Sequence, residues 1–354
     1  MGPFCIFAEI RSNSSIKNKL KQLMSNSKIS AAAFADTKPH YDLLDGLRGV
    51  AARGVAALMV IFYHVFEAFA TSPIDQRFNH GYLAVDFFFI LSGFVIGYAY
   101  DDRWKTMTTK DFIKRRLIRL HPMVVLGAVL GVIAFCIQGC EKWDGTQVSI
   151  SMVMLALLIN LFLIPAVPGS GPEIRGNGEM YPLNGPSWSL FFEYSGAGHL
   201  GVGWTMEEYN LIGGFLRVLF SFSIGLLMSR VFKPIPVKGA FWICSLAIVV
   251  LLSMPYVGNG EALWMNGIYD SVCAILIFPM LVYLGASGKT TDKHSARICK
   301  FLGDISYPLY MVHYPWPEAV ALVVGSIVLA YISLKLYDEP VRRYLTKRFL
   351  QVRK

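Results

Sequence analysis

Arg53 and His64 are the residues whose types and spacing first point to chemistry. Both lie in the apolar stretch 50–70, and a helix needs about 20 mostly apolar residues to cross a bilayer. At about 100° per residue, their separation returns them to within about 20° of one direction, roughly 16 Å apart along one helix face. Ionisable groups inside a span are costly and mark a site when they face a protein interior or a wet cavity. The alternative is that Arg53 snorkels to the interface and His64 forms a hydrogen bond between helices.

Asp86 is the acidic partner that the sequence suggests for His64. The first span would run outward and the second, residues 82–100, back inward, which brings the two side chains to similar depth. A carboxylate beside an imidazole fixes its tautomer and raises its basicity, as a general base requires. The alternative is that Asp86 only reaches the outer headgroups.

A group of arginines in the loop FIKRRLIRLHP, residues 112–122, is the second candidate. It comprises Arg115, Arg116 and Arg119. Guanidinium groups bind phosphate oxygens in pairs, so these residues could hold the phosphates of a cytosolic ligand. The spacing alone favours the simpler role, an anchor to anionic lipid worth about 1 kcal/mol per residue.

Two further stretches place ionisable or hydrogen-bonding groups in apolar sequence. NGPSWSLFFEY, residues 184–194, contains Trp188 and Glu193, and LGDISYPLYMVHYP, residues 302–315, contains Tyr307 and His313. Prolines interrupt the second stretch, and a broken intramembrane helix with ionisable groups is a reasonable place for a binding site. Taken singly, each stretch is more often structural. The glycines of residues 169–178 do not follow a strand, so we discount nucleotide binding there.

The composition indicates an all-α, polytopic transmembrane helical bundle. Of the 354 residues, 54% are hydrophobic and only 16% are charged, and the mean hydropathy is +0.47. The formal net charge of +9 does not imply nucleic acid as a partner, because cytoplasmic loops of membrane proteins collect Lys and Arg. The six cysteines form no CxxC pair and no metal-ligand spacing, so we interpret them as packing residues and expect no metal.

Apolar length predicts clear spans at residues 50–70, 82–100, 122–137, 148–167, 211–232, 239–257, 268–285 and 319–336. Basic clusters place both termini in the cytoplasm by the positive-inside rule. The chain then divides into a basic tail over residues 1–44, a membrane domain over 45–340 and a second basic tail over 341–354.

Two loops on the same side of a membrane must be joined by an even number of crossings. At two places in this topology, the clear spans between cytoplasmic loops give an odd number. Residues 188–204 and 301–317 must therefore cross or dip, although both stretches are short. They are either re-entrant segments or the remains of helices whose other parts are missing from this chain, and we favour the second. The prediction is about eight clear spans plus two partial ones.

Taken in order, these stretches resemble the signatures of the acyltransferase 3 family of bacterial integral-membrane O-acyltransferases. The matching segments, from about residue 44 to residue 349, are DGLRGVAA, RGVAALMVIFYH, GYLAVDFFFILSGF, FIKRRLIRLHP, NGPSWSLFFEY, LGDISYPLYMVHYP and YDEPVRR. The family's hallmark is an arginine, ten residues and a histidine in the first span, which Arg53 and His64 match. The combination is far more specific than any single motif.

The resemblance implies an enzyme of the bacterial inner membrane with about ten spans. Such an enzyme moves an acyl group, commonly acetyl from acetyl-CoA, to a hydroxyl of a carbohydrate or surface glycan, with membrane lipid as the other partner. His64 is then catalytic, with Arg53 and Asp86 beside it. The loop arginines contact the CoA phosphates, and the expected substrate-binding residues are Trp188, Glu193, Tyr307 and His313.

The chain departs from the family pattern in three places. Residues 48–52 and 53–57 both read RGVAA, and this duplication separates Asp45 from Arg53. The other two departures are the short segments 188–204 and 301–317. An inactive product of a disrupted gene is therefore one alternative.

A proton-coupled transporter is the other alternative. His64, Asp86 and Glu193 would then relay protons through the bundle. The lack of an obvious internal repeat in the sequence weighs mildly against this interpretation.

Overall fold

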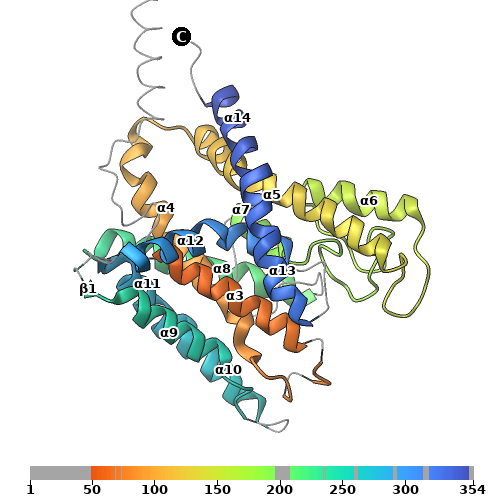
Figure 1. The fold of residues 1–354 in the computed structure, drawn as a ribbon, viewed down its shortest axis with the longest axis horizontal. Coiled ribbons are helices and arrows are strands. Elements are labelled where there is room, and N and C mark those ends of the chain that lie inside the picture. Colours follow the sequence, from red (N-terminus) through yellow and green to blue (C-terminus); the bar gives the residue numbers. More distant parts are fainter. Residues whose placement is uncertain are drawn as a thin grey trace, which may run out of the picture.

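The computed structural model describes residues 49–67, 69–72, 74–195, 208–233, 235, 237–258, 262–289, 293–313 and 319–350. The expected tail over residues 1–44, Asp45 and Arg48 lie outside these ranges. The described part is helical, as the sequence predicts, with one short parallel pairing of strands (Figure 1).

The α-helices are α3 (Gly49–Glu67), α4 (Ala84–Tyr100), α5 (Thr109–Ile137), α6 (Ile150–Leu161), α7 (Ser187–Ser195), α8 (Glu208–Val231), α9 (Ala240–Ser253), α10 (Leu263–Val272), α11 (Phe278–Ser287), α12 (Lys293–Val312), α13 (Ala319–Ile332) and α14 (Glu339–Phe349). The 3₁₀ turns η2 (Asn79–Leu83) and η3 (Asp101–Lys105) flank α4. The π-helical turns η4 (Cys273–Ile277) and η5 (Ser333–Asp338) join α10 to α11 and α13 to α14. The two strands are β1 (Val237–Lys238) and β2 (Gly288–Lys289).

Four described helical stretches are long and apolar enough to cross a membrane. They are Asn79–Lys105, Thr109–Ile137, Ile212–Val231 and Trp264–Ser287. Two others, α6 and α9, are apolar but shorter, with 12 and 14 residues. The predicted number of clear spans, about eight, is therefore not confirmed.

The helix α5 begins well before the apolar span that the sequence predicts from residue 122. The Thr108 hydroxyl accepts a hydrogen bond from the Asp111 N–H, and the Asp111 carboxylate accepts one from the Thr108 N–H. This capping box satisfies N–H groups that lack partners at a helix start, so it fixes where α5 begins. Residues 112–122, predicted as a loop, are consequently the first turns of a helix.

The stretch that contains His313 differs from its predicted form in a similar way. Residues 301–312 belong to α12, a helix of 20 residues that begins at Lys293, within sequence read as a cytoplasmic basic cluster. The other short stretch, residues 188–204, is helical over α7 up to Ser195. Residues 196–207 and 314–318 lie outside the described ranges, so the missing helix parts stay a prediction.

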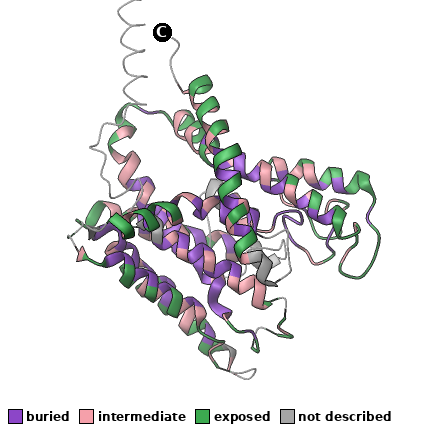
Figure 2. Ribbon diagram, viewed as in Figure 1, coloured by how far each residue is buried: buried purple, intermediate pink, exposed green. Residues whose placement is uncertain are grey.

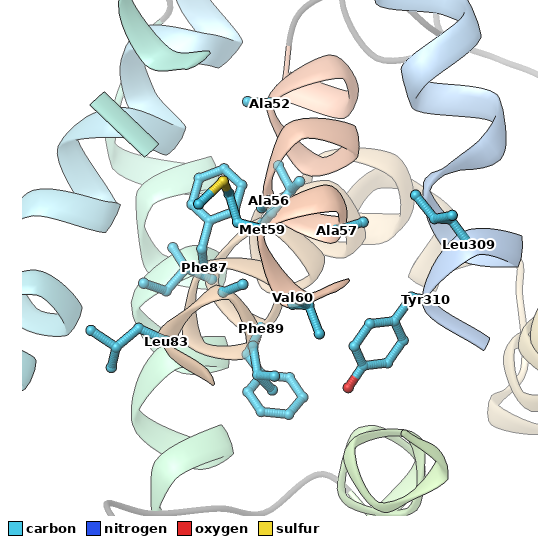
Figure 3. Packing of buried hydrophobic residues seen from close by; sticks show 14 of the residues in the cluster. Ala52, Ala56, Ala57, Met59, Val60, Leu83, Phe87, Phe89, Leu309 and Tyr310 are labelled. Atoms are coloured by element: carbon cyan, nitrogen blue, oxygen red, sulfur yellow. The ribbon is translucent and has the colours of Figure 1, made fainter. Parts of the chain in front are cut away.

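The core forms around α3, which contacts α4, α9 and α12 (Figure 1). Small side chains let these helices approach, and Ala52, Ala56 and Ala57 are at most 1% exposed (Figure 3). A Cβ atom at Gly54 would lie 2.4 Å from the Leu302 carbonyl oxygen, so glycine permits this close contact with α12. Buried residues line the inner faces of the bundle, and exposed residues line the outer faces of α9 and α14 (Figure 2).

Candidate active site

Arg53 lies near the start of the contact between α3 and α12. Its Nε atom donates a hydrogen bond to the Ser306 hydroxyl oxygen at 2.9 Å. That hydroxyl donates in turn to the Gly303 carbonyl oxygen at 2.8 Å. The bond holds the guanidinium on the side of α3 that faces α12.

His64 lies near the other end of α3, and one of its ring nitrogens is hydrogen-bonded to a carboxylate. Its Nδ1 atom lies 2.8 Å from Oε2 of Glu67, and the Tyr63 hydroxyl donates to Oε1 of the same carboxylate at 3.2 Å. An ionised carboxylate only accepts, so Nδ1–H donates and Nε2 carries the lone pair of a base. Glu67 follows His64 by three positions, a helix spacing that places side chains together, so the sequence already held this signal.

His313, directly after the end of α12, brings a second imidazole to His64. The two ring centroids are 5.4 Å apart at an interplanar angle of 32°. The Nδ1 atom of His313 lies 2.9 Å from the Tyr310 carbonyl oxygen and 3.3 Å from that of Leu309. Carbonyl oxygens only accept, so Nδ1–H donates here as well and Nε2 again carries a lone pair. His313 is 3% exposed.

Asp86 belongs to a different group of side chains. It accepts two hydrogen bonds from Arg217 of α8, one from Nε to Oδ1 at 2.7 Å and one from Nη2 to Oδ2. Arg217 also donates to the Tyr82 carbonyl oxygen at 3.1 Å. The structure gives no support to the predicted contact of Asp86 with His64, and the carboxylate that it places on His64 is Glu67.

The Asp86 group continues to His80 through polar side chains that the sequence analysis missed. His80 Nδ1 lies 2.8 Å from the Met254 carbonyl oxygen, and Nε2 lies 2.9 Å from Asn266 Oδ1, which also accepts from the Val257 N–H. Both ring nitrogens therefore face oxygen atoms of neighbouring segments. Asp270 Oδ1 lies 3.8 Å from the same Nε2 atom.

Tyr82 connects the two halves of this group. Its hydroxyl contacts both carboxylate oxygens of Asp270, at 2.9 and 2.8 Å, and accepts from Asn266 Nδ2 at 3.0 Å. We name Asp86, Arg217, Tyr82, His80, Asn266 and Asp270 the η2 cluster. Its members come from η2, α4, α8 and α10, which it ties together.

The arginines of residues 112–122 lie on the first turns of α5. Arg115 and Arg116 are half-buried and Arg119 is exposed. The helix α14 packs on this part of the molecule, and its Arg342 forms an ion pair with Asp338 at 2.6 Å. Burial raises the pKa of the Asp338 carboxyl to about 6, against the opposing effect of the Arg342 and Arg119 guanidiniums. Arg119 therefore has an acidic neighbour as well as cationic ones.

The predicted substrate-binding residues belong to two helices, α7 and α12, with His313 directly after α12. The Tyr307 hydroxyl donates to the Leu120 carbonyl oxygen at 2.6 Å and so ties α12 to α5. The Trp188 ring makes an edge contact with Phe89, and the Arg217 guanidinium lies 5.9 Å from its centroid. Of the predicted set, the structure places His313 beside His64. The side chain of Glu193 lies outside the described part of α7.

Comparisons with known proteins point to one family. The sequence profile described as "Acyltransferase domain", of the acyltransferase 3 family, matches residues 50–198 and 192–335. The two matched segments meet within 188–204, the first of the stretches that look shortened. No solved structure matches the chain.

Curated relatives agree with this assignment. "Protein 2 in picA locus" of Rhizobium radiobacter is 35% identical over 162 residues, which is 43% of this chain and 75% of the relative. "Exopolysaccharide production protein ExoZ" of Rhizobium meliloti (strain 1021) is 23% identical over 280 residues, 69% of this chain and 79% of the relative. A Staphylococcus aureus (strain COL) protein, named provisionally as an O-acetyltransferase, is 23% identical over 313 residues, 77% of this chain and 50% of its own length.

Proposed function

Because this chain belongs to the acyltransferase 3 family, and is thus a transferase enzyme, we propose that it moves an acyl group from acyl-CoA to a carbohydrate hydroxyl. The observation that carries the proposal is the bond between His64 Nδ1 and Glu67, which leaves Nε2 as the basic atom. The reported names of relatives favour acetyl as the acyl group and a surface polysaccharide as the acceptor. We place the enzyme in the bacterial inner membrane.

The reaction uses His64 twice. Its Nε2 atom takes the proton of the acceptor hydroxyl while the hydroxyl oxygen forms a bond to the thioester carbon. The carbon–sulfur bond then breaks, and the leaving thiolate takes the proton back from the imidazolium. Glu67 stabilises that imidazolium through Nδ1–H between the two proton transfers, as a carboxylate does for other catalytic histidines.

The remaining candidate residues lie at the two opposite ends of the contact between α3 and α12. Arg53 lies at the end near the cytoplasmic start of α3, and with the α5 arginines it would hold the CoA phosphates. His313 lies at the His64 end, where its Nε2 would accept a hydrogen bond from a second hydroxyl of the carbohydrate. The acyl-bearing arm would run along α3 between these ends. The transporter alternative loses support, because the family and the Staphylococcus aureus relative are named for acyl transfer.

The test is acetyl transfer by the purified protein in detergent, from radiolabelled acetyl-CoA to a mixed oligosaccharide pool. We expect labelled sugar from the wild type and a loss of roughly 10²- to 10⁴-fold in rate for His64→Ala, the range that a general base supplies. His294→Ala, an exposed histidine of α12, is the matched control and should keep the wild-type rate. Equal rates for the two variants would rule out His64 as the base.

A disrupted gene is the second candidate, and the two-part profile match favours it. A folded wild type that transfers no label would support this alternative. Insertion of the missing helical sequence at residues 188–204 should then restore transfer.

A further inference from the structure

Asn184 is a fully buried amide in the contact between α5 and α12. It is 0% exposed and stands in a turn where its N–H donates to the Tyr181 carbonyl oxygen at 3.0 Å. A Cβ atom added at Gly127 of α5 would lie 2.2 Å from Asn184 Nδ2 and 2.8 Å from the Met311 carbonyl oxygen of α12. The absence of a side chain at Gly127 thus makes the space that the amide occupies.

Neither polar atom of this amide has a hydrogen-bond partner in the described part of the chain. Both Oδ1 and Nδ2 of Asn184 are buried from solvent and unbonded. Buried amides nearly always have partners, because an unsatisfied donor or acceptor destabilises the folded state. A leucine would fill much the same space without that penalty. The amide is therefore best explained by a ligand that supplies the partner.

The depth of Asn184 along the bundle indicates which part of a ligand it would meet. The helices α3 and α12 run in one direction, with Arg53 beside Ser306 at one level and His64 beside His313 at another. The helix α5 follows the same order along α12, because Leu120 contacts Tyr307 and Gly127 lies beside Met311. Met311, whose carbonyl oxygen lies beside Gly127 as the Asn184 amide does, precedes His313 by two residues, or about 3 Å along a helix. Measured along α12, the depth of the Asn184 amide is therefore between those of the proposed phosphate end and the proposed base, close to the level of the base.

We propose that the Asn184 side-chain amide donates a hydrogen bond to the thioester carbonyl oxygen of the acyl donor and stabilises the oxyanion formed there. The inference rests on the proposed function. As the acceptor oxygen bonds to the carbonyl carbon, the carbonyl π electrons move to its oxygen, and Nδ2–H opposes that negative charge. Collapse restores the carbonyl and expels the CoA thiolate, which takes the proton held by His64.

The first experiment compares Asn184→Leu with a matched control, Asn160→Leu. Asn160 is also a buried amide with an unbonded Oδ1, but it lies on α6 and its Nδ2 donates to the Ala156 carbonyl oxygen. We expect Asn184→Leu to lower kcat by about 10²- to 10³-fold, with a much smaller change in KM and with a Tm at or above that of the wild type. Asn160→Leu should keep the wild-type kcat. Wild-type kcat in Asn184→Leu, or a kcat loss accompanied by a lower Tm, would overturn the proposal.

A second experiment needs no carbohydrate acceptor. Binding of acetyl-CoA is compared with binding of S-ethyl-CoA, a thioether in which a methylene replaces the carbonyl. The wild type should prefer acetyl-CoA by about 2- to 10-fold, the value of one hydrogen bond, and Asn184→Leu should lose that preference. If the leucine variant does not fold, Asn184→Ala is measured instead, and it should lose the preference for acetyl-CoA in the same way.

The outcomes separate this inference from the proposed function. If the Asn184 variants lost affinity equally for acetyl-CoA and S-ethyl-CoA, the amide would contact a part of CoA other than the carbonyl. That result would overturn the oxyanion role. A preference for acetyl-CoA that survives the substitution would do the same. A wild type that binds neither ligand would instead refute the proposed acyl-CoA function, and this inference with it.

Discussion

Two polar regions of this bundle differ in how far their ionisable groups are buried. In the η2 cluster, Asp86 is paired with Arg217, and these two side chains are 3% and 8% exposed. In the contact between α3 and α12, the His64 and Glu67 side chains are 32% and 50% exposed. Charges that balance each other in a dry interior hold helices together, whereas a base at a partly open place can act on a ligand. An ionisable residue inside a span is thus a candidate for function only until its partner is known.

The largest effect should come from breaking the ion pair of the η2 cluster. Arg217→Leu leaves the Asp86 carboxylate buried without its counter-charge, which destabilises a protein by about 3–5 kcal/mol. Thermal unfolding in detergent should show a strongly lowered Tm. The double variant Asp86→Leu, Arg217→Met should recover most of the loss, because apolar groups can replace a buried ion pair. If Arg217→Leu kept its Tm but lost transfer, the cluster would belong to the chemistry and the comparison would fail.

Removal of the charge on Glu67 should have a smaller effect, and on rate instead of stability. Glu67→Gln keeps an oxygen near His64 Nδ1 but loses the charge that stabilises the imidazolium. A hydrogen bond to a charged group contributes about 1.5–3 kcal/mol, so we expect kcat to fall about 10- to 100-fold at unchanged Tm. Asp75→Asn, the same chemical change in the exposed loop after α3, is the control. A wild-type kcat for Glu67→Gln would show that Glu67 does not support the base.

These two regions also show how far the sequence could lead. The shared face of Arg53 and His64 follows from helix geometry, and both residues meet α12 as that geometry requires. Glu67 was equally accessible, since residues three apart on a helix are neighbours. The Asp86–Arg217 pair was not, because 131 positions separate its members and packing alone brings them together.

The helix boundaries also separate features that the local sequence encodes from features that depend on packing. The start of α5 is encoded locally by Thr108 and Asp111, a capping box that the positive-inside interpretation overlooked. The basic start of α12 looked like a loop because apolar length was the only criterion for a span, whereas a helix can extend beyond the membrane. The orphaned amide of Asn184 is visible only once α5 and α12 are packed against it.

The smallest effect should come from Ser306→Ala on α12, which contacts Arg53 near the end of α3 opposite the base. The substitution removes the hydroxyl that accepts from Arg53 Nε and so loosens the guanidinium without removing its charge. One such bond contributes about 1 kcal/mol, so we expect KM for acetyl-CoA to rise roughly fivefold while kcat stays unchanged. Ser245→Ala is the control, because this buried hydroxyl on α9 has no hydrogen-bond partner among the described residues. A fall in kcat with unchanged KM would place Arg53 at the reacting carbonyl instead of the phosphates, and the two ends of the contact between α3 and α12 would no longer have separate roles.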